Sequence, residues 1–380
     1  MYGLSSGIDT IEAVGDDRFD PHGLEALDDG FDDDPDDLEA LRPYVVNLTR
    51  GAFSDDGIMQ TTPEDVDAIF DEHLPRFLDS VPGPVPVVLW AHGGIVPERA
   101  GLRIAGNQVP WWVRNGAYPI HFVWETGFTE TLKDLVSRWA LQPLGGRSAP
   151  WQSVKQSAQA ASEPGGGAHY VARRLADFCA RNPGRITVHA AGHSAGAIFH
   201  SHFVPAAGEL GVPGFGSLQL LAPALRIDEF ETTLLPMVGS GAIDQFVVYT
   251  MNADAERHDT CFRIYPRSLL YLVSEVFERP ADAPLLGLER SIRDSRQLLS
   301  AFGLEPPPPS RAEVIWSPTV PDAPEGSRSA ATSHGGFDND VETMNSVASR
   351  VLGRPDFATF PSGTASAGRV LRTPPADRNP

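Results

Sequence analysis

Cysteine, basic residues and long apolar runs are all scarce in this chain. Its 380 residues include 2 cysteines, Cys179 and Cys261, and neither belongs to a closely spaced metal-binding pair, so a disulfide framework is excluded. No apolar run approaches the roughly 18 residues that a membrane-spanning helix requires. Lys and Arg number 30 against 50 Asp and Glu, which gives a formal charge of −20. Such an acidic chain repels phosphate backbones and anionic lipids, so we expect no nucleic-acid partner and no membrane span.

The acidic residues are concentrated at the N-terminus. Residues 1–40 carry a formal charge of −13, which leaves −7 for the other 340 residues. The run DDGFDDDPDD at 28–37 lacks the ligand alternation and closing Glu of a calcium loop, which favours a solvated, disordered acidic tail. This tail is a candidate contact for a protein partner. The first residues also lack the basic and apolar regions of a signal peptide, so we expect a cytoplasmic protein.

The region from 41 to 353 alternates short β-rich runs with longer helical stretches, whereas residues 354–380 are rich in Pro, Ala, Ser and Arg and predict a second disordered tail. Six strands are expected, at 85–94, 117–127, 186–192, 217–224, 244–252 and 313–319. Because helices separate them, the pattern predicts a doubly wound, mostly parallel α/β sheet with helices on both faces. Residues 44–54 are candidates for one or two antiparallel edge strands. The stretch 129–167 is longer than a crossover needs and is a candidate lid insertion.

A G-x-S-x-G sequence, Gly192-His193-Ser194-Ala195-Gly196, follows the third strand and leads directly into a helix. In such a tight turn, the positions two before and two after the serine have no room for side chains, and the serine hydroxyl is exposed in a strained conformation. The helix N-terminus that follows favours a developing negative charge. This context indicates a nucleophilic Ser194 rather than an ordinary glycine-rich turn.

A second glycine pair, Gly93 and Gly94, follows His92 at the end of the first strand. An acyl-transfer serine needs a second backbone donor for the oxyanion, and this donor usually comes from the loop after an earlier strand. Glycine lets backbone N–H groups approach a substrate oxygen. We therefore expect Gly93 or Gly94 to supply this donor. His92 is expected to brace the loop rather than to transfer protons.

The general base and its acid partner must come from loops beyond the serine. His334 lies between the last strand and the closing helix and is the first candidate for the base, while His258 is the weaker one. For the acid, Asp254 is favoured because it follows the fifth strand by three to four residues. Asp259 is the alternative, and Glu256 comes third.

The remaining histidines have structural interpretations. His200 and His202 lie on the helix after the serine, where we expect surface or packing roles. His189 and His193 have a spacing of four residues, but they lie in a strand and a turn, which does not place them on one helical face as a zinc site requires. No metal is therefore expected.

Together, HGG after one strand, GHSAG after another, an acid after a third and a histidine loop after the last resemble an α/β-hydrolase-fold serine hydrolase of the esterase or lipase type, over residues 80–352. The resemblance implies Ser194 as nucleophile, His334 as base and Asp254 or Asp259 as the triad carboxylate. It also implies an oxyanion hole made by the N–H groups of Ala195 and of Gly93 or Gly94. Such an enzyme cleaves an ester, thioester or amide, with a carboxylic ester favoured, through an acyl-enzyme and without a cofactor.

Two functional hypotheses follow. In the first, the protein is this hydrolase acting on a small-molecule or acyl substrate, and the aromatic residues Trp111, Trp112, Phe199 and Phe203 favour an apolar acyl group. In the second, it is a catalytically inactive hydrolase-like scaffold or binding module. Labelling of Ser194 by a serine-directed probe would distinguish the two.

Overall fold

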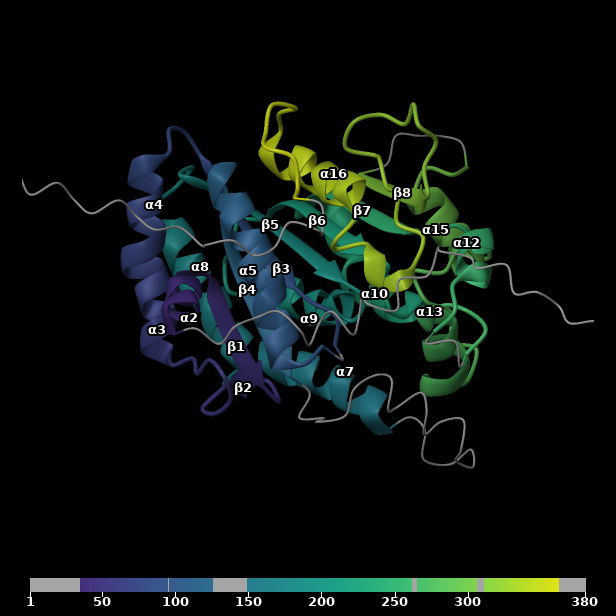
Figure 1. Ribbon diagram of the computed structural model, residues 1–380, viewed down its shortest axis with the longest axis horizontal. Coiled ribbons are helices and arrows are strands. Elements are labelled where there is room, and N and C mark those ends of the chain that lie inside the picture. The colour runs from purple at the N-terminus through teal and green to yellow at the C-terminus, as the bar shows by residue number, and fades with distance from the viewer. Residues whose placement is uncertain (1–34, 95, 126–148, 262–264, 306–310, 362–380) are drawn as a thin grey trace, which may run out of the picture.

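The computed structural model describes residues 35–94, 96–125, 149–261, 265–305 and 311–361. Its centre is an eight-stranded sheet of order β2-β1-β4-β3-β5-β6-β7-β8 (Figure 1), in which β2 is antiparallel to β1 and the other neighbours are parallel. The strands are β1 (Val45–Thr49), β2 (Ala52–Phe53), β3 (Val85–Ala91), β4 (Tyr118–Glu125), β5 (Ile186–His193), β6 (Phe215–Leu221), β7 (Ile243–Met251) and β8 (Ala312–Ser317). The predicted α/β class with a mostly parallel sheet is confirmed.

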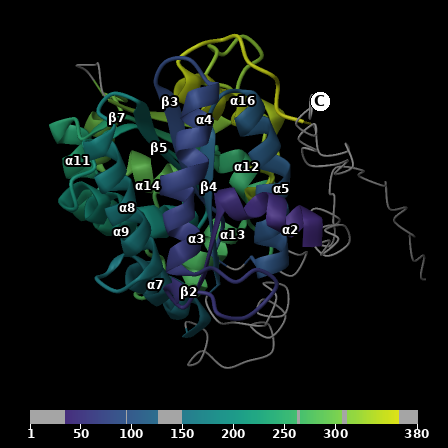
Figure 2. The ribbon, with the colours of Figure 1, turned by 90° about the vertical axis from the view of Figure 1, so that its left-hand side faces the viewer.

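The helices form two layers, with α8, α9 and α11 on one side of the sheet and α2, α5 and α16 on the other (Figure 2). The helices that precede β6 in the chain are α2 (Pro35–Leu41), α3 (Pro63–Ala68), α4 (Leu74–Ser80), α5 (Glu98–Arg114), α7 (Ala149–Ser162), α8 (Gly167–Arg181) and α9 (Gly196–Glu209). The later ones are α10 (Ile227–Thr233), α11 (Leu235–Ser240), α12 (Ala253–His258), α13 (Leu269–Leu272), α14 (Glu289–Arg293), α15 (Arg296–Ala301) and α16 (Val341–Leu352). No helix in the described ranges is both long and apolar enough to cross a membrane.

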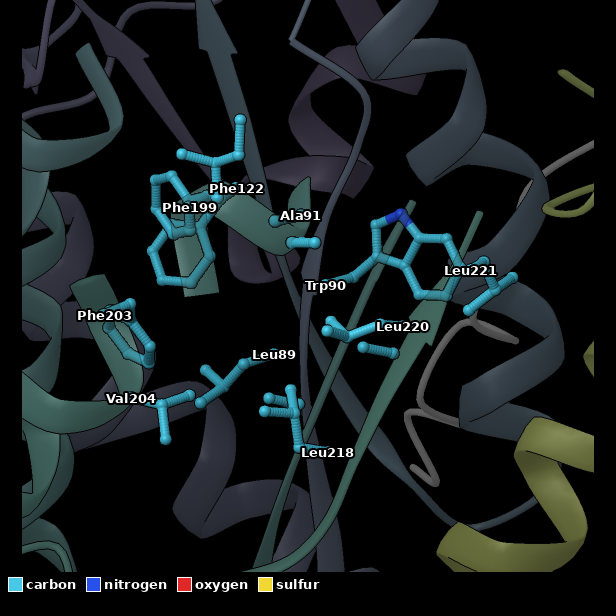
Figure 3. Packing of buried hydrophobic residues seen from close by; sticks show 14 of the residues in the cluster. Leu89, Trp90, Ala91, Phe122, Phe199, Phe203, Val204, Leu218, Leu220 and Leu221 are labelled. Atoms are coloured by element: carbon cyan, nitrogen blue, oxygen red, sulfur yellow. The ribbon is translucent and has the colours of Figure 1, made fainter. Parts of the chain in front are cut away.

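Consecutive side chains along a strand point to opposite faces of the sheet, and so pack against different helical layers. Phe122 of β4 packs on Phe199 and Phe203 of α9 (Figure 3), with ring centroids 4.8 and 5.2 Å away. Val123, the next residue, contacts the α5 side. Both faces of the central strands are therefore buried, as the continuous apolar runs predict.

Several boundaries differ from the expectations. The stretch 44–54 contains two strands, but only β2 is antiparallel, because β1 pairs in parallel with β4. Of the expected lid at 129–167, residues 129–148 lie outside the described residues. The rest contributes α7, whose buried Trp151 and Val154 place it in the helical layer.

The two expected tails are also shorter than predicted where the structure describes them. At the N-terminus, residues 1–34 are outside the described ranges, but α2 already occupies 35–41 and buries Leu41. At the C-terminus, residues 354–361 pack on α5 rather than trailing away. Phe360 is buried against Trp111, and the Trp111 indole donates a hydrogen bond to the Ala358 carbonyl. An aromatic anchor of this kind carries no periodicity and gives no signal in the composition.

Candidate active site

Ser194 occupies a strained turn between β5 and α9. Its φ of +54° lies in the left-handed region, which a residue with a side chain rarely adopts without support from its surroundings. The support here is tight packing: a Cβ on Gly192 would lie 2.9 Å from the backbone of Gly196, and one on Gly196 would collide with the carbonyl of Ala91. The Ser194 N–H also donates to the Leu221 carbonyl at 2.8 Å. The turn therefore has the geometry expected from the sequence motif.

His334 lies beside this serine, at the start of a short 3₁₀ turn (η4, His334–Gly336) between β8 and α16. Its Nε2 is 2.9 Å from the Ser194 Oγ. Burial, followed by the nearby His193, lowers the pKa of His334 well below its ordinary value. A neutral imidazole can thus accept the serine proton at Nε2, which places its own proton on Nδ1. Among the described residues, Nδ1 has no hydrogen-bond partner.

The three candidate acids occupy different environments in and after α12. Asp254, the first choice from the sequence, is not brought to His334: its side chain is 80% exposed and pairs with Arg257 one turn along the helix. Asp259 is brought there, since its Oδ2 accepts the backbone N–H of His334 at 2.9 Å. Glu256 is buried and accepts a hydrogen bond from the Ser268 hydroxyl. The short helix α12 begins directly after β7 and turns Asp254 outward, and the end of the same helix lies beside the loop that carries His334.

The HGG segment lies next to the serine turn. A Cβ on Gly93 would be 3.5 Å from the Cβ of Ser194, and a Cβ on Gly94 would be 2.9 Å from that of Ala195. Ala195 is the N-cap residue of α9, so its N–H belongs to the positive end of a 14-residue helix. The loop of Gly93 and Gly94 and the N-terminus of α9 thus lie side by side at Ser194, and an oxyanion requires backbone donors of the kind that two such segments carry.

His92 braces this segment, as we expected from the sequence. Its Nδ1 lies 2.7 Å from the Gly93 carbonyl, and its Nε2 accepts the Trp124 backbone N–H at 3.1 Å. The Trp124 indole donates back to the His92 carbonyl at 3.0 Å. Complete burial lowers the pKa of His92 to about 4, so the ring is neutral and serves as a fixed link between the loop and β4.

The other histidines considered from the sequence are not near Ser194 Oγ. His258 is exposed and its Nδ1 bonds to the carbonyl of Asp254. His200 is fully buried and bonds to the Ala191 carbonyl, while His202 approaches Glu229. His189 bonds to two hydroxyls, and the described part of the chain contains no group of three or more His, Cys, Asp and Glu side chains suited to a metal.

The aromatic residues that suggested an apolar substrate are core residues. Phe199 and Phe203 fill the layer between α9 and β4, and Trp111 and Trp112 are buried on α5. The expectation of an apolar acyl group therefore loses its basis. Aromatic residues in buried helices look alike in sequence whether they pack or line a site.

Two residues near the base were given no role there by sequence reasoning, which considered His193 only as a possible zinc partner of His189 and did not consider Asp338. His193 Nε2 lies 2.9 Å from the His334 carbonyl, and His193 Nδ1 lies 3.8 Å from the carboxylate of Asp338. Both side chains are buried. The only sequence signal was proximity, since each stands within four residues of a candidate catalytic residue.

Comparison of the chain with known proteins found no matching family model and no matching curated protein.

Proposed function

We propose that the protein is a serine hydrolase of the α/β-hydrolase fold that cleaves a carboxylic ester, or a related thioester or amide, through an acyl-enzyme on Ser194. The observation that carries this proposal is the 2.9 Å approach of His334 Nε2 to the Oγ of a serine held at a φ of +54°. Strain of this kind costs about 1–3 kcal/mol and persists where function or packing demands it.

The proposed reaction uses Ser194 and His334 in two half-reactions. Ser194 Oγ attacks the substrate carbonyl carbon while its proton passes to His334 Nε2, and the carbonyl oxygen becomes an oxyanion. The N–H groups of Ala195 and of Gly93 or Gly94 are the donors that would stabilise it, since both segments lie next to Ser194. The protonated His334 then gives its proton to the leaving group. Water repeats the sequence on the acyl-enzyme, releases the acid and restores Ser194.

Asp259 is the proposed acid of the triad. Its Oδ2 already accepts the backbone N–H of His334, and its second carboxylate oxygen can accept the Nδ1–H of the same residue. Catalytic hydrogen bonds are often loose in unliganded structures and tighten when substrate binds. The Nδ1 of His334, which has no hydrogen-bond partner in the part of the chain that the structure describes, is the group that this second oxygen would satisfy.

Hydrolysis of a short-chain nitrophenyl ester tests the proposal. We expect a Ser194→Ala variant and a His334→Ala variant each to lose turnover by about 10³-fold or more while folding normally. His258→Ala is the matched control, because that histidine is exposed and away from the serine, and it should keep full turnover. Equal activity in all three variants would support the inactive-scaffold hypothesis, with background hydrolysis at some other group.

A comparison of two Asp→Asn variants tests whether Asp259 or Asp254 is the acid of the triad. Asp259→Asn should lower kcat by about 10³- to 10⁴-fold, since the amide favours the wrong imidazole tautomer. Asp254→Asn removes an exposed carboxylate paired with Arg257, so its kcat should stay within a few-fold of wild type. The opposite ranking would restore Asp254 as the triad acid.

A further inference from the structure

We infer that His193, held by Asp338, is a positioning residue that fixes the general base through the main-chain carbonyl of His334. This inference rests on the proposed function, because it assigns a role within the same site. It concerns the residue immediately before the nucleophile.

The direction of the hydrogen bond determines how His193 is used. A carbonyl oxygen can only accept, so His193 Nε2 carries the proton that it donates to the His334 carbonyl at 2.9 Å. The other ring nitrogen, Nδ1, faces Asp338 Oδ2 at 3.8 Å. Both side chains are less than 10% exposed, so water does not compete strongly for the hydrogen bond to the His334 carbonyl and does not screen the Asp338 carboxylate strongly from the ring.

Together with Asp259, this contact holds both ends of the His334 peptide backbone. The N–H of His334 donates to Asp259, and its carbonyl accepts from His193. One anchor comes from the end of α12 and the other from the end of β5. Because His193 is bonded directly to Ser194 along the chain, the base is tied to the strand that carries the nucleophile.

This connection sets the separation of the reacting atoms. Rotation of the η4 turn would break the His193 bond before it could withdraw His334 from Ser194. Loss of geometry of about 1 Å between reacting groups can cost about 100-fold in rate. The short 3₁₀ turn has no long helix of its own to hold it, so the anchors on its backbone matter.

His193 is also expected to affect the pKa of His334 through its charge. The groups that face His193 are Asp338, the ring of His334 at 5.2 Å between centroids, and His92. Burial raises the pKa of Asp338, and His193 and, on the α5 side, Arg103 partly oppose that rise. Burial is the larger cause of the lowered pKa of His334, and the neighbouring His193 ring lowers it further. Removing the His193 imidazole should therefore raise the pKa of His334.

Two substitutions separate positioning from bulk packing. The amide nitrogen of His193→Gln reaches about as far as imidazole Nε2 and can still donate to the carbonyl, whereas His193→Leu cannot. We expect kcat to fall about 10- to 100-fold in His193→Leu with KM nearly unchanged, and to stay within about 3-fold of wild type in His193→Gln. Adding Asp338→Asn to His193→Leu should cause no further loss, since the two act as one unit.

The control is His189→Leu, which removes another buried histidine of β5 whose partners are Ser217 and Thr187. It should lower the melting temperature without changing kcat per folded molecule. Equal kcat in wild type and His193→Leu, or an equal loss in the Leu and Gln variants, would overturn the inference.

A readout without substrate keeps this test separate from the proposed function. The pKa of His334, followed by the ¹⁵N shifts of its ring in NMR spectra, should rise in both His193 variants and stay unchanged in His189→Leu. An unchanged pKa in the His193 variants would overturn the charge effect of His193 on the base, while the kcat of His193→Leu against that of His193→Gln decides the positioning role. Failure of the proposed function would appear differently, as hydrolysis that Ser194→Ala does not affect.

Discussion

Replacing Glu256 by glutamine should stabilise the protein, by an amount that grows with pH. Glu256 is 1% exposed, one turn before Asp259, and burial raises the pKa of its carboxyl from 4.5 to about 8. The Ser268 hydrogen bond opposes this shift and the charge of Asp259 adds to it. The folded-state pKa thus lies above the unfolded one. The contribution of this carboxyl to stability is therefore fully present below pH 4.5 and is lost as the pH rises toward 8.

The magnitude follows from the size of this shift. Each pKa unit corresponds to about 1.36 kcal/mol, so the carboxyl lowers the free energy of unfolding by about 1 kcal/mol at pH 5 and about 3 kcal/mol at pH 7. Glutamine does not titrate and avoids this cost. Urea denaturation of wild type and Glu256→Gln at both pH values measures the difference, and comparing the two pH values cancels any pH-independent change in contacts.

The expected result is a stability gain that increases by about 2 kcal/mol between pH 5 and pH 7. Glu72→Gln serves as the control, because that side chain is exposed and its replacement should have the same small effect at both values. If the gain from Glu256→Gln were identical at pH 5 and pH 7, the carboxyl would not be protonated in the folded protein, and this reasoning would fail.

Three further results are expected. Gly196→Ala should abolish turnover and lower the free energy of unfolding by about 1–3 kcal/mol, because the new methyl group meets the backbone of β3; in urea denaturation Gly239→Ala, with no heavy atom within 4 Å of the added carbon, should not be destabilised. The pKa of His334 is lowered, so kcat/KM should stay constant as the pH falls through 6.5 and decline only at lower pH; a midpoint at or above 6.5 in the pH profile would contradict this. Phe360→Ala should destabilise the protein by about 3 kcal/mol in thermal unfolding, through lost packing on Trp111, whereas an unchanged melting temperature would show that residues 354–361 are not docked.

The parts of the site that depend on local sterics were predictable from the sequence. A sharp turn from strand to helix needs glycine two residues before and after its centre, and Gly192 and Gly196 show that need directly. The α/β class followed in the same way from alternation of apolar strands with helices. The pairing of β1 with β4 was not predictable, because it depends on the path of the chain after β2 rather than on the residues of β1.

The choice of acid depended on contacts distant in sequence. Counting residues from the end of β7 favoured Asp254, but α12 begins at Ala253 and turns that side chain to solvent. Asp259 meets His334 across 75 positions of the chain. Likewise, the His193 contact spans 141 positions. Contacts between residues so far apart in the chain produce no local sequence pattern, so the spacing of residues alone could not identify Asp259 and His193.

The most direct test of the central claim is covalent labelling of the wild-type protein with a fluorophosphonate, followed by peptide mapping. We expect one phosphonate per chain, located on Ser194, and no labelling in Ser194→Ala. Labelling should slow by at least about 100-fold in His334→Ala, since the hydroxyl then lacks its base. A protein that stays unlabelled, or that is labelled equally well after loss of Ser194, would contradict the assignment of Ser194 as a nucleophile.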